Sequence, residues 1–425
     1  MATTGKIVEV LFENALETHE LEPQLLELTT LVTPDAAMMQ NSGDVQWRTV
    51  DQHADLFSGF DATGQESEII EEEYPRILGV PTNDLPKQRI DKLRDMQFWK
   101  RRGQESGKQQ ARECNKQIAV AMAKQAGMYY RSNATSGFDF LDEASVLMSE
   151  RQLASTESCF MINPRDMSTF AKDLAARQTI KGRPEDTWKT GQIGSGVSEF
   201  DGIYKGNYLP NILGGAASTT VTGNHTFKPE GGTADQDAGT VTNVDYRNAT
   251  LIVADSSVFV AGSKVTISNS GTTVKALGLA DKTDTGQAMT FTVKSITDAT
   301  HIVISPKPIA YDDSSLTRLE KQYANIDTQI LNTATVDRAN VDASKKVNLF
   351  WDKSAVEVIG GTMPIELFGD MAGKKYISET LANGLEMYMI YDGDILTLDF
   401  RFRIFTWYGI TIANPSAVGV ATTYS

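Results

Sequence analysis

One long segment organises this chain: residues 85–130 read LPKQRIDKLRDMQFWKRRGQESGKQQARECNKQIAVAMAKQAGMYY. Asn83 or Asp84 can cap a helix that starts here, and Pro86 occupies a first-turn position where proline is tolerated. Apolar residues near the end recur at steps of three and four, which places them on one helix face. They are Ala111, Cys114, Ile118, Met122, Ala126 and Tyr129. The pattern predicts a helix over 85–130.

The middle of this segment, residues 100–110, has no apolar face. Gly103 and Gly107 each lower the helix propensity there by about 1 kcal/mol relative to alanine. A helix with two anchored ends and a solvated, weakened middle is typical of an element that spans a structure. The composition is equally compatible with two shorter helices joined by a loop. Both alternatives indicate a structural element and not a catalytic centre.

Length and charge narrow the class of protein. A chain of 425 residues accommodates two or three domains. Its net charge of −15 argues against sequence-specific nucleic-acid binding, and we interpret Lys100, Arg101 and Arg102 as a solvated helix face. No apolar run approaches the roughly 18 residues of a membrane span, and the acidic N-terminus does not resemble a signal peptide. Two distant cysteines, Cys114 and Cys159, are typical of a reducing cytoplasm.

The first thirty residues alternate apolar and acidic positions with helical spacing. The sequence predicts a helix over 1–30, with an apolar side that includes Leu11 and Ala15. The other side is strongly negative, and its members are Glu9, Glu13, Glu17, Glu20 and Glu22. Such a face is a candidate to bind a basic partner. An ordinary surface helix explains the same pattern equally well.

The next regions read as a hairpin and then as mixed α/β structure. Residues 45–50 alternate like a strand and a second extended run covers 68–80, which together predict a long hairpin. Farther on, the patterns predict helices over 138–153 and 167–177 and a short buried strand over 158–162. The chain after residue 348 returns to this character, with a strand at 355–359 and one or two strands within 396–412.

The composition changes between residues 216 and 342, where Thr, Ser, Gly and Asp dominate. Short alternating runs predict a separate all-β module, a small barrel or sandwich. These runs are 240–244, 250–253, 264–268, 289–296 and 301–305. Polar loops are expected at 229–240 and 269–287. The first resembles a calcium loop, but Tyr246 stands where the bidentate glutamate would be needed, so we reject that interpretation.

No catalytic, cofactor-binding or metal-binding constellation is recognisable. The four histidines lie in unrelated contexts and the two cysteines lack a metal-ligand spacing. The loop at 191–196, GQIGSG, has neither the dinucleotide nor the phosphate-loop order, and a plain turn is the better interpretation. The neighbouring carboxylates Asp312 and Asp313, and likewise Asp392 and Asp394, are typical of turns and helix caps. The sequence therefore favours a structural protein over an enzyme.

Several runs in this chain resemble one family closely. They are TFTVKSITDATHIVISPKPIAYDDSSLTRLEKQYAN at 290–325, FRIFTWYG at 402–409, NPSAVGV at 414–420, NPRD at 163–166 and TFKP at 226–229. Taken in the order in which they follow one another along the chain, these runs are similar to the coat, or major capsid, proteins of short-tailed phages of the lederbergvirus group. Weaker similarity extends over nearly the whole chain.

The resemblance implies an α+β fold of the tailed-phage capsid (Hong Kong 97) type with an inserted six-stranded β-barrel. It also implies a division into segments along the chain. These are an N-terminal arm at 1–35, an extended hairpin loop at 36–84, a spine helix and peripheral domain at 85–137, an α/β core at 138–215, the inserted barrel at 216–342, and the remaining axial and peripheral core at 343–425.

The function implied by the resemblance is assembly and not catalysis. Many copies, as hexamers and pentamers, would form an icosahedral T=7 procapsid with a scaffolding protein and a portal protein. The shell would expand as it packages double-stranded DNA, which it encloses without sequence-specific binding. The protein would belong to the virion after assembly in the bacterial cytoplasm, with no cofactor and no membrane. An encapsulin-like compartment is the alternative, against which the inserted barrel and the arm argue.

The resemblance also suggests site residues. Glu13 and Glu17 stand where the family carries acidic residues that meet basic residues of the scaffolding protein. Asp235 and Asp237 lie in a loop expected to reach a neighbouring capsomer, although the sequence of that loop departs from the family. Gly103 and Gly107 are candidate hinge residues for bending of the spine helix during expansion.

Overall fold

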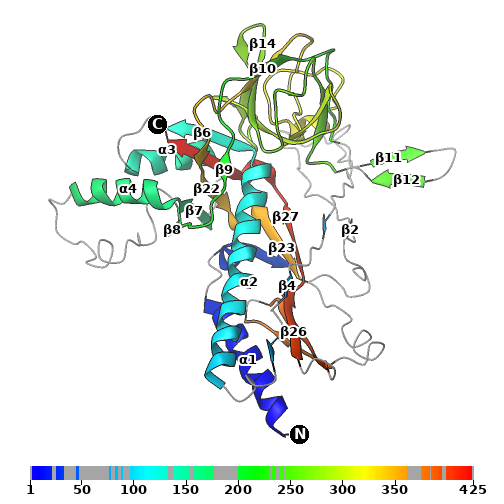
Figure 1. Cartoon of the computed structure of the whole chain (residues 1–425). Helices are drawn as coiled ribbons and strands as arrows, with labels where there is room; N and C mark the ends of the chain where they lie inside the picture. Colours follow the sequence, from blue (N-terminus) through cyan, green and yellow to red (C-terminus); the bar gives the residue numbers. More distant parts are fainter. Residues whose placement is uncertain are drawn as a thin grey trace, which may run out of the picture. The chain divides into compact units, whose positions relative to one another are not determined.

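The computed structural model divides the chain into two units and describes most of both (Figure 1). Unit 1 comprises Met1–Gln46, Arg76–Ala119 and Val356–Thr411, and unit 2 comprises Trp47–Pro75, Val120–Ala355 and Ile412–Ser425. Helices combine with largely antiparallel sheets, so the predicted α+β class is confirmed. The described residues are 2–21, 25–32, 45–46, 76–77, 82–84, 88–89, 96–132, 137–153, 157–176, 200–229, 232–235, 240–243, 245–360, 375–382, 384–394 and 399–423.

The long helix α2 is a single uninterrupted element, Met96–Gln125. The alternative of two shorter helices is therefore wrong, and the predicted span of 85–130 was too long at both ends. Before the helix, β4 (Thr82–Asp84) and β5 (Gln88–Arg89) pair with a strand more than 300 residues away, and after it β6 (Met128–Ser132) joins another sheet. Sheet partners remote in sequence thus override the local helical spacing.

Unit 1 opens with helix α1, Ala2–Leu21. The predicted helix over 1–30 was too long, because β1 (Thr30–Val32) runs parallel to β23 (Val356–Gly360) in a sheet completed by β27 (Tyr408–Ile412). A short 3₁₀ turn, Leu26–Leu28, precedes β1. The second sheet of unit 1 is antiparallel and has the order β24 (Lys375–Thr380), β25 (Glu386–Asp394), β26 (Asp399–Thr406) and β4.

The apolar run near the C-terminus forms two strands of unit 1, β26 and β27. Of the one or two strands predicted there, two are present. Trp407, between them, is 1% exposed and lies in a small core with Ile359, Tyr388 and Phe405. The rings of Tyr388 and Phe405 stack with centroids 5.4 Å apart. Of the predicted hairpin at 45–80, only the pairing of β2 (Val45–Gln46) with β3 (Arg76–Ile77) lies within the described residues.

The core sheet of unit 2 confirms the mixed α/β character predicted for 138–213. Its order is β6, β28 (Val418–Thr423), β22 (Asn348–Asp352), β7 (Ser158–Ile162) and β8 (Gly202–Lys205). The predicted helices are α3 (Gly137–Glu150) and α4 (Pro164–Ala176), and the predicted strand is β7. Phe160 of β7 and Phe350 of β22 stack in the core between these elements, with centroids 6.0 Å apart. A short pair, β9 (Asn211–Ile212) with β21 (Lys345–Lys346), lies beside the insertion in sequence.

The predicted all-β module is a closed barrel of six strands. Their order is β10 (Ser218–Thr220), β20 (Thr335–Arg338), β14 (Lys264–Asn269), β18 (Thr290–Ile296), β19 (His301–Ser305) and β13 (Ala249–Ile252). A bridge between Val221 and Val253, with Ala254 N donating to Thr220 O at 2.8 Å, joins the last strand to the first. Closure removes the free sheet edges.

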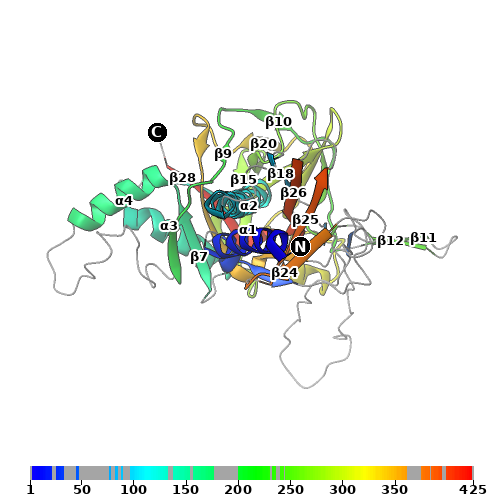
Figure 2. The ribbon, with the colours of Figure 1, turned by 60° about the horizontal axis from the view of Figure 1, so that its bottom comes forward.

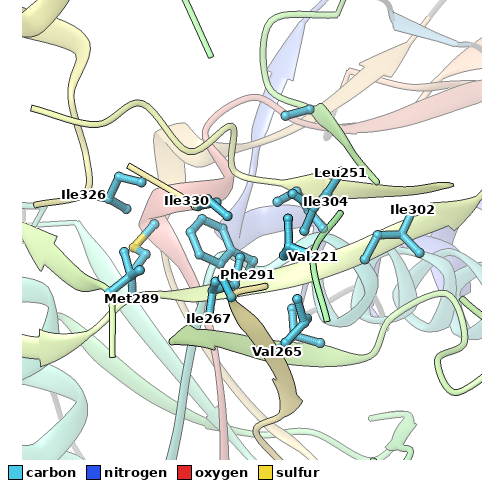
Figure 3. Packing of buried hydrophobic residues seen from close by; sticks show 14 of the residues in the cluster. Val221, Leu251, Val265, Ile267, Met289, Phe291, Ile302, Ile304, Ile326 and Ile330 are labelled. Carbon is cyan, nitrogen blue, oxygen red and sulfur yellow. The ribbon is translucent and has the colours of Figure 1, made fainter. Parts of the chain in front are cut away.

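Apolar side chains from alternate strand positions fill the barrel (Figure 3). Phe291, Ile267 and Ile304 are fully buried at its centre. The predicted loop at 269–287 is wrong in part, because it contains the short strands β15 (Thr272–Thr273), β16 (Lys275–Leu277) and β17 (Asp284–Ala288). These strands are too short and too polar to give an alternating signal. The other predicted loop carries a two-stranded hairpin of β11 (Gly232–Asp235) and β12 (Thr240–Asn243).

Buried polar side chains of the barrel bind the backbone that follows α2. Lys264 is 1% exposed and donates from Nζ to Ala126 O at 2.8 Å and to Thr292 Oγ1 at 2.5 Å. Thr290 Oγ1 donates to Gly127 O at 2.9 Å. Burial holds the pKa of Lys264 well below its ordinary value. Because buried carbonyls at a helix C-terminus need partners, the barrel completes the end of α2.

Charged side chains hold together the two ends of the insertion, here called the neck of the barrel, and bind them to the core sheet. Arg131 in β6 donates two parallel hydrogen bonds to the carboxylate of Asp342, one of them at 2.5 Å from Nη2 to Oδ1. Arg338 in β20 donates to Gly215 O at 3.0 Å and to Val258 O at 2.5 Å. Bidentate geometry of this kind fixes orientation as well as distance. The neck of the barrel is therefore held by specific polar contacts.

Candidate interaction surfaces

Helix α1 presents a ridge of exposed carboxylates, here called the acidic ridge and made of Glu9, Glu13, Glu17 and Glu20. At 100° per residue these four side chains fall within one narrow arc of the helix. Glu20 Oε1 also accepts a hydrogen bond from Ala382 N at 2.8 Å, in the turn between β24 and β25. The candidate residues Glu13 and Glu17 are thus brought together on an accessible helix face.

The opposite arc of α1 is buried. Its apolar members pack into unit 1, and the fold exposes almost none of their surface. They are Ile7, Val8, Leu11, Phe12, Ala15 and Leu16. Each buried aliphatic or aromatic side chain contributes on the order of 1.5–3 kcal/mol, which explains why a helix that would be marginal alone is stable here. One side of α1 is therefore buried in unit 1, and the other is exposed.

The first half of α2 lies directly against α1, side by side in both Figure 1 and Figure 2. A Cβ atom on Gly103 would come well under 3.0 Å from Leu11 O, and one on Gly107 would do the same with Ala15 O. Both glycines are buried. The predicted solvated middle is therefore wrong for this face of α2. The hinge role of these glycines remains a prediction.

Some polar side chains of α2 are buried because they bind backbone groups of unit 1. No pattern in the sequence predicts their burial. Gln110 Nε2 donates to Ile404 O at 3.0 Å. Asn115 Oδ1 accepts from Leu25 N at 3.2 Å, which ties the segment after α1 to the same helix. Sequence reasoning missed these residues because their partners are remote in the chain. The signal of this contact in the sequence was the recurrence of small residues at 103, 107 and 111. The two glycines among them were interpreted as lowering the helix propensity.

His19 lies at the end of the contact between the two helices. It is 1% exposed, its Nδ1 has no hydrogen-bond partner, and its backbone nitrogen would be 3.1 Å from a Cβ on Gly107. Burial lowers the pKa of His19 to about 4, an effect that the neighbouring Glu20 carboxylate opposes. The imidazole is therefore neutral at pH 7. Protonation would place a charge inside the helix contact.

The outer face of α2 carries the opposite charge from α1. Lys100 and Arg101 are exposed, in agreement with the predicted solvated face. Arg102 is half-buried, and its guanidinium lies over the ring of Phe98, 5.5 Å from the centroid. Such stacking contributes about 0.5–1 kcal/mol at an exposed site. The stacking of Arg102 on Phe98 stabilises the first turns of α2, and the acidic ridge is the charged face that belongs to α1.

The remaining predicted site residues lie in unit 2. Asp235 ends strand β11 opposite Thr240, so it stands at the tip side of the β11–β12 hairpin. Asp237 lies outside the described residues, as does the glycine-containing loop at 191–196. Asp313 accepts hydrogen bonds from Ser315 N and Oγ at 2.9 and 2.8 Å, which is the turn role predicted for it. Asp392 and Asp394 instead lie within strand β25.

Both cysteines, Cys114 and Cys159, are buried free thiols. Burial raises the pKa of Cys114 to about 12 and that of Cys159 to about 11, so neither thiol is an activated nucleophile. Within the described ranges, no three His, Cys, Asp or Glu side chains are grouped so as to hold a metal ion. Among the helices of those same ranges, none has both the length and the apolar character to span a bilayer.

Comparison with known proteins identifies the family. Similar solved structures include the capsid of cyanophage P-SCSP1u (TM-score 0.43, 10% identity, 94% of this chain and 87% of that chain) and Mycobacterium phage Che8 (TM-score 0.41, 10% identity, 93% and 89%). A virus-like particle from Pyrococcus furiosus gives a TM-score of 0.37 at 10% identity, covering 97% and 98%. The assignment itself rests on sequence, because the family model described as "P22 coat protein - gene protein 5" matches residues 1–423. This chain belongs to the P22 coat protein family.

Proposed function

We propose that this protein is the major capsid protein of a short-tailed phage of the lederbergvirus type. Copies of the chain, arranged as hexamers and pentamers, form an icosahedral T=7 shell. The family match over residues 1–423 is the observation that carries the proposal. The segment boundaries given above for the arm, hairpin loop, spine helix, core and barrel are part of this proposal, and the closed six-stranded barrel supports the one at 216–342.

The acidic ridge of α1 is the proposed contact for a scaffolding protein. Glu13 and Glu17 are exposed, adjacent along one helix face, and unobstructed by the packing of α1 on unit 1. A helix with lysines or arginines at matching three- or four-residue spacing would complement them. Surface ion pairs of this kind contribute little each and weaken in salt. They suit a partner that guides assembly and then leaves.

The remaining partners follow from the function of a shell. A portal protein would occupy one vertex, and the shell would enclose double-stranded DNA in the virion after assembly in the bacterial cytoplasm. The net charge of −15 supports enclosure without tight binding, because an acidic protein repels the phosphate backbone. The β11–β12 hairpin, with Asp235 and the adjoining Asp237, is the proposed contact with a neighbouring capsomer.

Expansion of the shell is where the proposed hinge would act. If α2 bends at Gly103 and Gly107, α1 must move with it, because Leu11 and Ala15 lie on those glycines. Amide hydrogen exchange of α2 before and after expansion tests this role. Changed protection around the two glycines is expected, and equal protection in both states would exclude the hinge.

Electron microscopy of the expressed chain, alone and with its phage's scaffolding protein, tests the proposed function. Uniform closed shells with the scaffolding protein, and irregular assemblies without it, are the expected result. A small soluble oligomer under both conditions would contradict the capsid function. Uniform shells in the absence of any partner would support a shell protein but contradict the need for scaffolding.

A further inference from the structure

The contact between α1 and α2 brings the two helix backbones together at Gly103 and Gly107. Gly103 and Gly107 lie on the face of α2 next to Leu11 O and Ala15 O, with Asn14 Cβ 3.3 Å from the place a Cβ on Gly103 would take. Ala111, one turn farther on, is fully buried. We call the two glycines and Ala111 the glycine seat. Small residues at four-residue spacing allow two helix backbones to approach this closely.

The glycines have no local reason to be in a helix. Glycine lowers helix propensity relative to alanine because it loses more backbone freedom on folding. Neither Gly103 nor Gly107 has a positive φ angle or ends the helix, since α2 continues to Gln125. Their small size is what the structure uses, because any side chain at either position would displace α1.

The glycine seat also fixes the rotation of α1 about its own axis. The contact requires Leu11 and Ala15 to face α2, which leaves Glu13 and Glu17 on the outer arc. A rotation by one residue, about 100°, would bring Asn14 or Leu16 to the place of Ala15, so that a larger side chain would stand against Gly107. Such a rotation is excluded while the backbones touch. The seat therefore determines which carboxylates reach a partner.

We propose that Gly103 and Gly107 are positioning residues for partner binding, which they control by holding α1 in the one rotation that presents the acidic ridge. The close contact is independent of any partner, while its consequence for binding rests on the proposed scaffolding contact. Replacement of either glycine by alanine lifts or turns α1 although all carboxylates remain. A hinge role is distinct, because it concerns the bending of α2 during expansion and makes no claim about the binding of a partner.

Hydrogen exchange of the full-length chain, followed by mass spectrometry, tests whether the two glycines hold α1 in place. Gly107→Ala, and separately Gly103→Ala, should accelerate exchange of the amides in residues 7–20 by about tenfold or more. Exchange in α3 and in the barrel should be unchanged, which shows that the fold is intact. The matched control is Gln109→Ala, an exposed position between turns of the same helix, which should leave α1 unchanged. Unchanged α1 exchange in both glycine variants would overturn the seat.

Binding of a lysine-rich helical peptide, measured over a range of salt concentrations, tests the consequence. We expect Gly107→Ala to lose affinity about as far as the Glu13→Gln/Glu17→Gln variant does, and to lose the salt dependence with it. Accelerated α1 exchange with wild-type affinity would overturn the positioning role. If the wild type and the charge variant bind equally, the scaffolding contact itself fails, while the exchange result still decides whether the glycines seat α1.

Discussion

The barrel of unit 2 and the α1–α2 contact of unit 1 use opposite kinds of residue. Phe291, Ile267 and their neighbours fill the barrel with side chains from a closed ring of strands (Figure 3). Gly103 and Gly107 supply no side chain and so let two helix backbones touch. Stability of the barrel therefore comes from buried apolar area, whereas attachment of α1 depends on the shape of one contact as well as on its buried apolar side. One added methyl group should disturb α1 more than it disturbs the barrel.

Removal of a large side chain from the barrel should have the greatest effect. Phe291→Ala leaves a cavity in a fully buried core, and we expect it to lower the free energy of unfolding by about 3–5 kcal/mol. Urea unfolding of the full chain measures it. The control Val260→Ala, at a barrel position that is 47% exposed, should stay within about 0.5 kcal/mol of the wild type. Similar losses of stability in both variants would show that the apolar area buried at a position does not determine its contribution to the stability of the barrel.

Acid should weaken the attachment of α1. The pKa of His19 is about 4 in the folded protein and 6.5 in the unfolded chain, so the unfolded state takes up the proton first as pH falls. The stability that depends on a neutral His19 is fully present above pH 6.5 and is lost progressively between pH 6.5 and 4. It amounts to about 1.4 kcal/mol per pH unit, or about 3 kcal/mol in total.

Unfolding of wild type and His19→Leu across this pH range isolates the effect from carboxylates that titrate nearby, Glu20 among them. The difference in stability between the two proteins should change with pH below 6.5 and stay constant above it. A difference that is independent of pH would show that His19 is not buried in the contact.

The barrel neck should show a smaller, pairwise effect. Arg131 and Asp342 make two parallel hydrogen bonds, and each side chain is about four-fifths buried, with relative exposures of 20% and 18%. A double-mutant cycle with Arg131→Met and Asp342→Asn should give a coupling energy of about 1–2 kcal/mol. Additive single effects would mean that the pair does not act as a unit, and that the barrel is attached by its buried threonines and Lys264 instead.

The strands of the barrel could be predicted because each of them buries side chains at alternate positions. Alternation at 264–268 and 289–296 reports which side chains face the interior, so β14 and β18 were expected close to where they lie. The strands at 272–288 were missed because β15 and β16 have only two and three residues, and because β17 has no apolar side chain before Ala288. Closure of the sheet followed only from the family resemblance, since no single strand encodes its neighbour.

The α1–α2 contact could be predicted only in part. The amphipathic pattern of α1 gave both its buried side and Glu13 and Glu17 on the exposed side. Gly103 and Gly107 were singled out, but their low helix propensity was interpreted as a solvated, flexible middle. A helix taken alone does not show that another backbone lies on it. Buried polar residues such as Gln110 were missed for the same reason, because the partner of Gln110 is 294 residues away.

The charge variant Glu13→Gln/Glu17→Gln should have the smallest effect on stability, within about 0.5 kcal/mol, because both side chains are exposed. Its effect on assembly should be large. The matched control is Asp139→Asn/Glu143→Gln, which removes two exposed carboxylates at the same four-residue spacing from α3.

Electron microscopy of each variant expressed with the scaffolding protein gives the most direct test of the acidic ridge. We expect uniform closed shells from the wild type and the α3 control, and irregular or absent shells from the Glu13→Gln/Glu17→Gln chain. Uniform shells from that chain, containing as much scaffolding protein as the wild type, would contradict the function proposed for α1.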